Sequence, residues 1–411
     1  MQEEYDIVVI GGGLVGASFA CALQRQGLRI AVVEQFDLLK TGHACYDDRS
    51  VALAYGTRVL FELIGVWERI APEAAPIEKI HVSEQGGFGV TRLDHAQQGV
   101  EALGYVIENR LLGAALYRHL DDRLQMDFFM PAELSGFRRE NDRVSVHFVH
   151  QGRECAASAR LLVAADGAQS RVRDWASLRT TTKDYGQSAI VCNLTPEYPH
   201  ESVAYERFTG SGPLAFLPLT DFAEAGQPAA PRCAVVWNMP HAQAQQMSVL
   251  DEGAFLQALQ EHIGYRLGRL LHRGKVNVYP LHLVKAETTV SPRVALIGNA
   301  AHTLHPVAGQ GFNLGMRDAM ALAELIATAA GRGEDIGGEA LLQAYAQSRR
   351  QDHRRVIRVT DILAQLFTFQ WPPLRLARNL GMLVTDTLPG CKTLLARSAM
   401  GLDGRLPGFR Q

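Results

Sequence analysis

The first thirty residues constrain the fold more than any other part of the chain. Residues 6–10 (DIVVI) form a short apolar run that ends at three consecutive glycines. A run of this length and composition is typical of a strand buried on both faces of a parallel sheet. Residues 14–26 carry apolar side chains at helical spacing, Gly27 closes that segment, and residues 30–33 (IAVV) form a second apolar run. The order predicts a strand–helix–strand unit.

The turn of this unit carries Gly11, Gly13 and Gly16, and the second strand is followed by Glu34. Glycines at this spacing let the strand turn sharply, let a pyrophosphate approach the backbone and let the helix pack closely. Free amides at the start of the helix can then hold phosphate groups. A carboxylate after the second strand accepts hydrogen bonds from ribose hydroxyls and repels a 2′-phosphate. We therefore expect a dinucleotide site, the alternative being an ordinary glycine-rich turn.

Two later segments also end in loops that could face phosphate groups. Residues 161–165 (LLVAA) form a buried-strand run that ends at Asp166-Gly167, with Arg173 further on. Residues 294–297 (VALI) end at Gly298-Asn299 and lead to the loop and helix start Gly309-Gln310-Gly311-x-Asn313. A plain nicotinamide dehydrogenase does not need these additional loops, so they favour a different dinucleotide.

The rest of the chain indicates an α/β fold in which a Rossmann-like dinucleotide domain is interrupted by a β-rich substrate domain and followed by a helical tail. From residue 183 to 284 the pattern changes to alternating stretches that favour antiparallel strands. Residues 312–330 and 340–369 read as long helices. The predicted divisions are 1–182 and 285–370 for the dinucleotide domain, 183–284 for the substrate domain and 371–411 for the tail.

Composition narrows the class of protein. The 411 residues are 47% hydrophobic, and 41 basic residues against 43 acidic ones leave a net charge of −2, so nothing favours a nucleic-acid partner. The six cysteines are widely separated, which argues against a disulfide framework and a structural metal. Neither a signal peptide nor an apolar run of membrane-spanning length is evident. We expect a cytoplasmic protein, at most peripheral on the inner face of a membrane.

The loops around Asp166 and Gly309 resemble the FAD-binding motifs of the flavoprotein aromatic hydroxylases. Two further segments, residues 47–53 (DDRSVAL) and 104–110 (GYVIENR), are similar to the ubiquinone-biosynthesis branch, and within it to the 2-polyprenyl-6-methoxyphenol hydroxylases. The resemblance covers residues 7 to about 405. Many relatives have Gly-Asp where this chain has Gly298-Asn299, but Asn is usual in the polyprenylphenol branch and can still bond a ribityl hydroxyl or a phosphate.

The resemblance implies a set of cofactor-binding residues. The glycine turn and Glu34 would hold the ADP half of FAD, while Asp166 would approach the pyrophosphate with Arg173 bracing its loop. The 309–311 amides would face the isoalloxazine and stabilise negative charge on the reduced ring. The full expected set is Gly11, Gly13, Gly16, Glu34, Arg49, Arg110, Asp166, Asn299, Gly309, Gln310, Gly311 and Asn313.

The implied reaction uses FAD, NAD(P)H and O₂ to hydroxylate a polyprenylated phenol, with the reductant docking transiently near the flavin. No catalytic side chain is assigned. His302 and His305 could act as a base or could pack the loop. Tyr185, Tyr205 and Arg207 could roof the substrate or support the sheet. Three alternatives stay open: a hydroxylase of another ring, a flavin-dependent isoprenoid reductase, and a binding module without turnover.

Residues 362–388 interleave leucines and aromatic residues with arginines. Such a segment could lie on a membrane surface and collect a lipid-tailed substrate, or it could pack as a helix on the FAD domain. We expect the substrate head group between the β-rich insertion and Pro306, and its tail near residues 362–388. The partners would then be the membrane or other ubiquinone-biosynthesis proteins; the sequence does not fix an oligomeric state.

Overall fold

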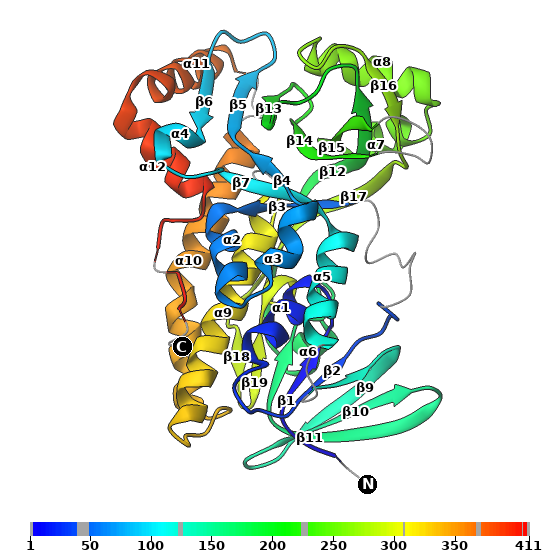
Figure 1. Cartoon of the computed structure of the whole chain (residues 1–411), viewed down its shortest axis with the longest axis vertical. Helices are drawn as coiled ribbons and strands as arrows, with labels where there is room; N and C mark the ends of the chain where they lie inside the picture. The colour runs from blue at the N-terminus through cyan, green and yellow to red at the C-terminus, as the bar shows by residue number, and fades with distance from the viewer. Residues whose placement is uncertain are drawn as a thin grey trace.

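The computed structural model describes residues 3–38, 49–121, 126–222, 229–306, 309–366, 371–404 and 406–408. Two large sheets lie at opposite ends of the molecule, with a small sheet between them, as Figure 1 shows. Asp47, Asp48, Phe367 and Phe369 belong to segments considered in the sequence and lie outside the described residues. The mixed α/β class and the helical C-terminal segment are confirmed.

The first sheet is built on the predicted strand–helix–strand unit. Its parallel strands are ordered β19 (Val294–Leu296), β11 (Arg153–Ala164), β1 (Glu3–Ile10), β2 (Ile30–Val33) and β8 (Met126–Phe129), and β18 (Val290–Ser291) pairs antiparallel with β19 at the edge. Ile7 pairs with Leu161 on one side and with Ile30 on the other. The four apolar runs identified in the sequence thus become adjacent parallel strands, and their carboxyl ends meet at one edge.

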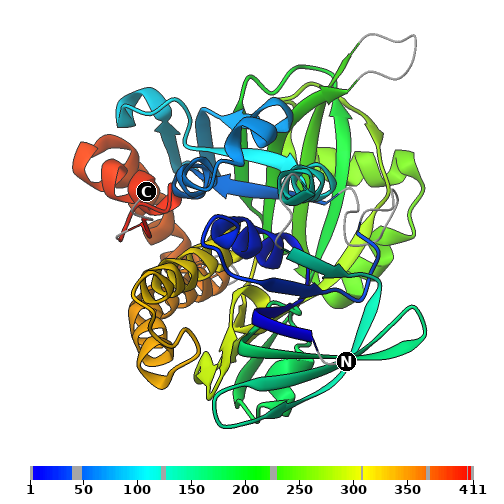
Figure 2. The same cartoon turned by 60° about the horizontal axis from the view of Figure 1, so that its bottom comes forward.

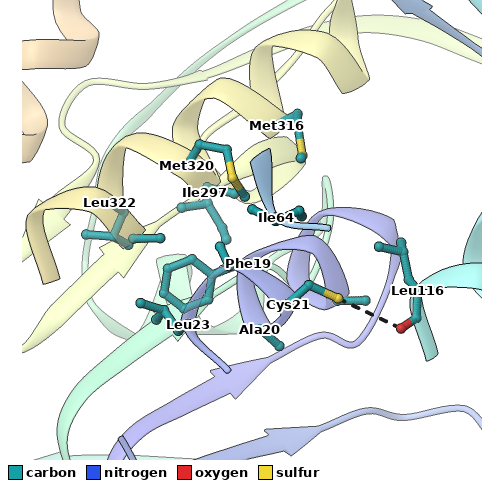
Figure 3. Close-up of a cluster of buried hydrophobic side chains, with 14 of the residues drawn as sticks. Phe19, Ala20, Cys21, Leu23, Ile64, Leu116, Ile297, Met316, Met320 and Leu322 are labelled. Atoms are coloured by element: carbon teal, nitrogen blue, oxygen red, sulfur yellow. Dashed lines mark hydrogen bonds between the residues drawn. The ribbon is translucent and has the colours of Figure 1, made fainter. Parts of the chain in front are cut away.

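Both faces of this sheet are covered. Helices α1 (Leu14–Leu23), α5 (Asn109–Asp121) and α9 (Gln310–Gly331) cover one face, and Figure 3 shows Phe19 of α1 among Met316, Met320 and Leu322 of α9. The other face packs against a hairpin of β9 (Ala132–Arg139) and β10 (Val144–His150), which continues into β11. The long helix α10 (Glu339–Leu366) lies beside α9 (Figure 2). Burial on two sides explains why these strands read as continuous apolar runs.

The second sheet holds nine strands and forms the upper part of Figure 1. Most come from the predicted insertion: β12 (Thr180–Pro196), β13 (Val203–Phe208), β14 (Pro213–Phe222), β15 (Ala230–Pro240), β16 (Leu270–Arg273) and β17 (Asn277–Ala286), with β20 (His302–Thr303) at one edge. Helices α7 (His241–Ser248) and α8 (Glu252–Ile263) belong to this region, and α8 packs on one face.

Besides β20, two strands of this sheet come from outside the expected insertion. β5 (Lys79–Glu84) pairs in parallel with β13, and β6 (Val90–Asp94) pairs with β5. We therefore propose that the substrate domain comprises residues 79–94 as well as 183–284. The small sheet of β3 (Ser50–Ala54), β7 (Gly104–Glu108) and β4 (Ala75–Ile77) lies between the two large sheets. Short helices α2 (Tyr55–Leu63), α3 (Trp67–Ile70), α4 (His95–Gln98) and α6 (Arg171–Trp175) complete this part, with single turns η2 (Ala71–Glu73) and η3 (Gly298–Ala300).

The tail forms α11 (Pro372–Thr387) and α12 (Pro389–Ala399), which lie beside β5 and β6 in Figure 1. Asn379 of α11 accepts a hydrogen bond from the Gly89 amide at 2.7 Å and donates to Glu84 at 2.6 Å. Arg378 is almost fully buried and ion-pairs with Glu84. Polar contacts therefore hold α11 on the edge of the second sheet. Within the described residues, no helix is both long and apolar enough to cross a bilayer.

Candidate functional site

The glycine turn between β1 and α1 has the geometry that the sequence predicts. Gly11 has φ +97° and a Cβ there would overlap the Ala165 carbonyl; a Cβ at Gly16 would overlap the carbonyl of Gly11. Gly13 is different, because a Cβ built on it meets nothing within 4 Å. Gly11 and Gly16 are therefore needed for packing within the protein, whereas Gly13 borders open space at the start of α1.

Glu34 is buried and forms hydrogen bonds that hold this turn in place. Its Oε2 accepts a hydrogen bond from the Gly12 amide at 2.7 Å, and its Oε1 accepts one from the Phe36 amide at 2.9 Å. Tyr117 on α5 donates to the Gly12 carbonyl at 2.6 Å, a contact that the sequence did not reveal. A carboxylate has about four acceptor positions, so these two hydrogen bonds do not by themselves fill those of Glu34.

Asp166 follows β11 at the same edge of the sheet. Its Oδ2 accepts a hydrogen bond from the Val172 amide at 3.2 Å, while its Oδ1 is buried without a hydrogen-bond partner among the described residues. Burial raises the pKa of this carboxyl above its ordinary value, and hydrogen bonds from Ser170 and the Val172 amide partly oppose that effect. Arg173 donates to the Ala168 and Ala300 carbonyls, at 3.0 and 3.1 Å, and so ties this loop to η3 as expected.

The loop after β19 reaches the start of α9. Asn299 is exposed on η3, and Gly309 caps α9 with φ +59° while a Cβ there would meet Ala52 at 3.0 Å. Gly311, in the first turn of α9, borders open space, because a Cβ there meets nothing within 4 Å. Backbone amides in the first turn of a helix have no intrahelical partner. Gly13 and Gly311 thus border open space at the starts of two different helices.

The side chain of Asn313, which we expected to bind the cofactor, is fully engaged within the protein. Its Oδ1 accepts hydrogen bonds from the Ala54 amide and the Thr57 hydroxyl, and its Nδ2 donates to the Ala52 and Gly309 carbonyls. These four bonds use the whole capacity of an amide side chain. Asn313 therefore anchors β3 to α9 and positions the Gly309 loop, and its side chain is no longer expected to bind the cofactor.

The two motifs that carry Arg49 and Arg110 meet at one end of the small sheet, where the Arg49 carbonyl accepts a hydrogen bond from the Asn109 amide at 2.8 Å. The Arg49 guanidinium lies 5.0 Å from the centre of the Tyr279 ring. Arg110 is half-exposed, 3.6 Å from Glu108. Their contact with a cofactor remains a proposal.

A cavity of about 780 Å³ joins the Gly309 loop to the second sheet and the tail. Its walls include Pro306 and Gly311 at one side, Leu214 and Val236 of the second sheet, and Met382 of α11. Most of the lining is apolar, as is usual for small-molecule sites of this size. The cavity occupies the region between the insertion and Pro306 where the sequence placed a substrate.

One carboxylate faces this cavity among the described lining residues, and sequence reasoning missed it. On β13, Ala204, Glu206 and Phe208 line the cavity, and Tyr205 contacts His81 on the opposite face. Arg207 alternates with Glu206 and shares the face of Tyr205. Tyr205 and Arg207 therefore do not roof the substrate. The alternation of side chains along β13 is the sequence feature that could have revealed Glu206. Each face of this strand carries both polar and apolar residues, so the sequence does not show which face is turned toward the cavity.

Comparison with known proteins decides the family. A family model described as an FAD binding domain matches residues 4–360. The chain belongs to this FAD-binding family. It is 36% identical to ubiquinone hydroxylase UbiL of Rhodospirillum rubrum, covering 96% of this chain and 89% of that one. It is 29% identical to 3-demethoxyubiquinol 3-hydroxylase of Escherichia coli, covering 98% and 100%.

Among solved structures, p-nitrophenol 4-monooxygenase PnpA of Pseudomonas putida has the same fold, with a TM-score of 0.81 at 19% identity over 98% of this chain and all of that one. The predicted cofactor FAD and the enzyme class, an FAD-dependent aromatic-ring monooxygenase, are confirmed. NAD(P)H and O₂ are the co-substrates typical of that class.

The described residues fit FAD. Gly13 and Gly311 leave open space where a ligand can lie against the backbone. The Oδ1 of Asp166, which has no hydrogen-bond partner among the described residues, could accept a hydrogen bond from the cofactor near its pyrophosphate. Glu34 lies beside the first turn, where its carboxylate could accept hydrogen bonds from ribose hydroxyls. The assignments of individual residues to parts of FAD remain our proposal, and Asn313 is excluded from side-chain contact.

Neither candidate histidine lines the cavity. His305 is buried with its ring 4.9 Å from that of Tyr185, and burial lowers its pKa to about 4, so it is neutral at pH 7. Tyr185 in turn donates to Asp361 at 3.1 Å. His302 points into the helices and contacts Asp318 at 2.6 Å. Both histidines therefore pack the loop, and neither is placed to act as a base on a ligand in the cavity.

Asp318 is the centre of a buried charged cluster behind the FAD loop. His302, His353 and Arg349 all contact its carboxylate, at 2.6, 2.7 and 2.7 Å. Two histidines and a carboxylate within 4.8 Å could in principle hold a metal, but the Arg349 guanidinium already donates to Asp318 and its charge opposes a cation. Ion pairing holds the pKa of Asp318 well below its ordinary value despite burial. The cluster fastens the loop after η3 to α9 and α10.

Proposed function

We propose that this protein hydroxylates a polyprenylated phenol of the 2-polyprenyl-6-methoxyphenol type in ubiquinone biosynthesis, using NAD(P)H and O₂. The observation that carries the proposal is the shape of the cavity, which runs from the Gly309 loop past the second sheet to α11 and α12. A small phenol would fill one end. The remaining apolar walls suit a hydrocarbon tail, whose burial is favourable by about 0.8 kcal/mol for each methylene. Relatives named as ubiquinone hydroxylases support the same substrate class.

FAD supplies the redox and oxygen chemistry once reduced. The protein then has three tasks. It holds the substrate ring beside the Gly309 loop, excludes water, and stabilises the negative charge that develops on the cofactor. The backbone amides at the start of α9, where Gln310 and Gly311 lie, point along the helix axis and favour negative charge there. Leu214, Ala215 and Val236 provide apolar walls that exclude water from the ring.

The far end of the cavity is formed by the tail of the chain. Leu374, Ala377 and Met382 of α11 and Leu395 of α12 line it. We propose that the polyprenyl tail leaves between these two helices. This arrangement differs from the packing alternative raised for residues 362–388, because α11 lies on the edge of the second sheet and covers the cavity instead of the FAD-binding sheet.

The outer face of α11 is apolar and exposed. Leu376, Leu380, Leu383 and Val384 are each between 44% and 54% exposed, and their spacing places them on one helical face. Trp371, just before the helix, is 67% exposed. A stripe of this kind, directly outside the end of an apolar cavity, suits the surface of a lipid bilayer. We propose that α11 rests on the membrane and that the substrate enters from it.

Quinone profiling of a strain lacking the gene tests the function, because the accumulated intermediate identifies the missing hydroxylation. In vitro, the phenol should stimulate NAD(P)H oxidation and O₂ uptake together. An isoprenoid reductase on the same scaffold would oxidise NAD(P)H without consuming O₂, so an oxygen electrode separates the two functions. Accumulation of no ubiquinone precursor in the deletion strain would contradict the proposal.

A further inference from the structure

Glu206 is the structural feature that the proposed reaction leaves unexplained. It lies in the middle of β13, with Val82 of β5 on one side and Ala215 of β14 on the other. Val82, Ala215 and Val236 line the cavity together with Glu206, so the carboxylate stands in an apolar row. A charged side chain in such a row is costly unless it has a partner.

The described residues provide no partner for this carboxylate. No hydrogen bond or ion pair joins it to them, and burial alone raises its pKa to about 7. Its accessible surface faces the cavity rather than bulk water, since protein surrounds it. The small Ala215 beside it leaves room for a flat ring over the sheet.

Other ionisable groups around β13 are engaged elsewhere. Arg378 is the other ionisable residue that lines the cavity, and it is ion-paired with Glu84 of β5. His81 of β5 lies against Tyr205 on the opposite face. Lys79 begins β5 and Asp221 lies near the end of β14, and neither lines the cavity. Glu206 is thus the one carboxylate among the described lining residues, and the amide oxygen of Asn238 is a neutral acceptor in the same lining.

We infer that Glu206 accepts a hydrogen bond from the ring hydroxyl of the phenolic substrate and so orients the ring against the FAD-binding loop. The inference rests on the proposed function and adds a substrate-positioning residue to it. A hydrogen bond to a charged acceptor in an apolar setting is among the stronger ones. It also discriminates sharply, because a ligand without the hydroxyl would leave the carboxylate unpaired.

The test uses the FAD-loaded enzyme and two probes, a short-chain 2-alkyl-6-methoxyphenol and its methyl ether, which lacks the donor. Binding is measured by calorimetry and by the change in flavin absorbance. Wild type should bind the phenol roughly tenfold or more tightly than the ether. Glu206→Leu should bind both alike, and Glu206→Gln should keep part of the preference because its amide oxygen still accepts. Arg207→Leu, on the opposite face, should keep the full preference.

The pH dependence gives a second readout. In wild type the phenol should bind more tightly as pH rises through about 7, because the carboxylate form is the better acceptor. Glu206→Gln should remove that dependence, and the ether should show none in either protein. A preference for the phenol that survives in Glu206→Leu would overturn the role of Glu206 alone. If wild type binds neither probe, the proposed function fails and the inference with it.

Discussion

The amide of Gly12 donates a hydrogen bond to Glu34 Oε2 at 2.7 Å, and this contact joins the two halves of the dinucleotide fingerprint. The same carboxylate accepts the Phe36 amide, so Glu34 holds the turn as well as facing the expected ribose. Glu34 thus stabilises the glycine turn and also places a carboxylate beside the expected ribose.

Glu34→Ala should therefore weaken FAD binding by about 1.5–3 kcal/mol, the usual contribution of hydrogen bonds to a charged group. Glu34→Gln should lose less, because one of its two acceptors remains. Equilibrium titration of the apoprotein with FAD measures both effects. Identical affinities for wild type and Glu34→Ala would show that Glu34 has no part in the site.

Gly13 offers a cleaner test of the pyrophosphate path, because a Cβ built on it meets no other atom within 4 Å. Gly13→Leu should fold with a melting temperature close to that of wild type and should fail to take up FAD. Gly16→Leu is the matched contrast, since its side chain would collide with the Gly11 carbonyl and destabilise the fold itself. Retention of FAD by folded Gly13→Leu would move the cofactor away from this turn.

The sequence predicted this region well because its determinants are local. The strand from Ile7 onwards, the glycine turn and the strand ending before Glu34 are contiguous, and each buried strand shows an unbroken apolar run. The pairing of β5 with β13 joins segments more than a hundred residues apart, and no local pattern encodes it. Glu206 was missed for a related reason, because only the pairing of β13 shows which of its faces meets the cavity.

The amides at the start of α9 are expected to matter for the reduced cofactor. Gly311→Pro removes one amide donor in the first helical turn, where proline is tolerated, and should slow reduction by NAD(P)H while FAD stays bound. Gly311→Ala keeps the donor in a position with room for a methyl group, and should reduce at nearly the wild-type rate. Stopped-flow absorbance of the flavin separates the two variants; equal rates in both would mean that this amide faces elsewhere.

The Asp318 cluster is expected to stabilise the fold behind the site. Asp318→Asn removes the buried negative charge that Arg349 and two histidines contact, while Arg349 keeps its ion pair with Asp352. The substitution should lower the free energy of unfolding at pH 7 by about 1.5–3 kcal/mol, the usual contribution of hydrogen bonds to a charged group. The folded-state pKa of Asp318 is depressed, so its contribution is fully present above the unfolded value near 4 and is lost as pH falls through the folded value. Urea unfolding at neutral and acid pH, with exposed Asp142→Asn as control, measures the difference. A constant difference at all pH values would contradict this assignment.

The outer face of α11 should govern access to long-tailed substrate. Replacing Leu380, Leu383 and Val384 by Ser should abolish sedimentation with phosphatidylcholine vesicles and lower activity on a long-tailed phenol, with little change on a tail-free one. The control replaces three exposed apolar residues far from the tail helices, Val249, Tyr265 and Leu271, by Ser. Equal losses on both substrates in the α11 variant would indicate a purely structural role for this face.

The central claim is that the protein inserts one oxygen atom from O₂ into a polyprenylated phenol. The most direct measurement incubates the FAD-loaded enzyme with NAD(P)H, isotopically labelled dioxygen and a 2-polyprenyl-6-methoxyphenol, and analyses the product by mass spectrometry. The expected product carries one labelled oxygen on the ring, with one NAD(P)H oxidised for each product formed. A reduced product without label, or NAD(P)H oxidation that leaves the phenol unchanged, would contradict it.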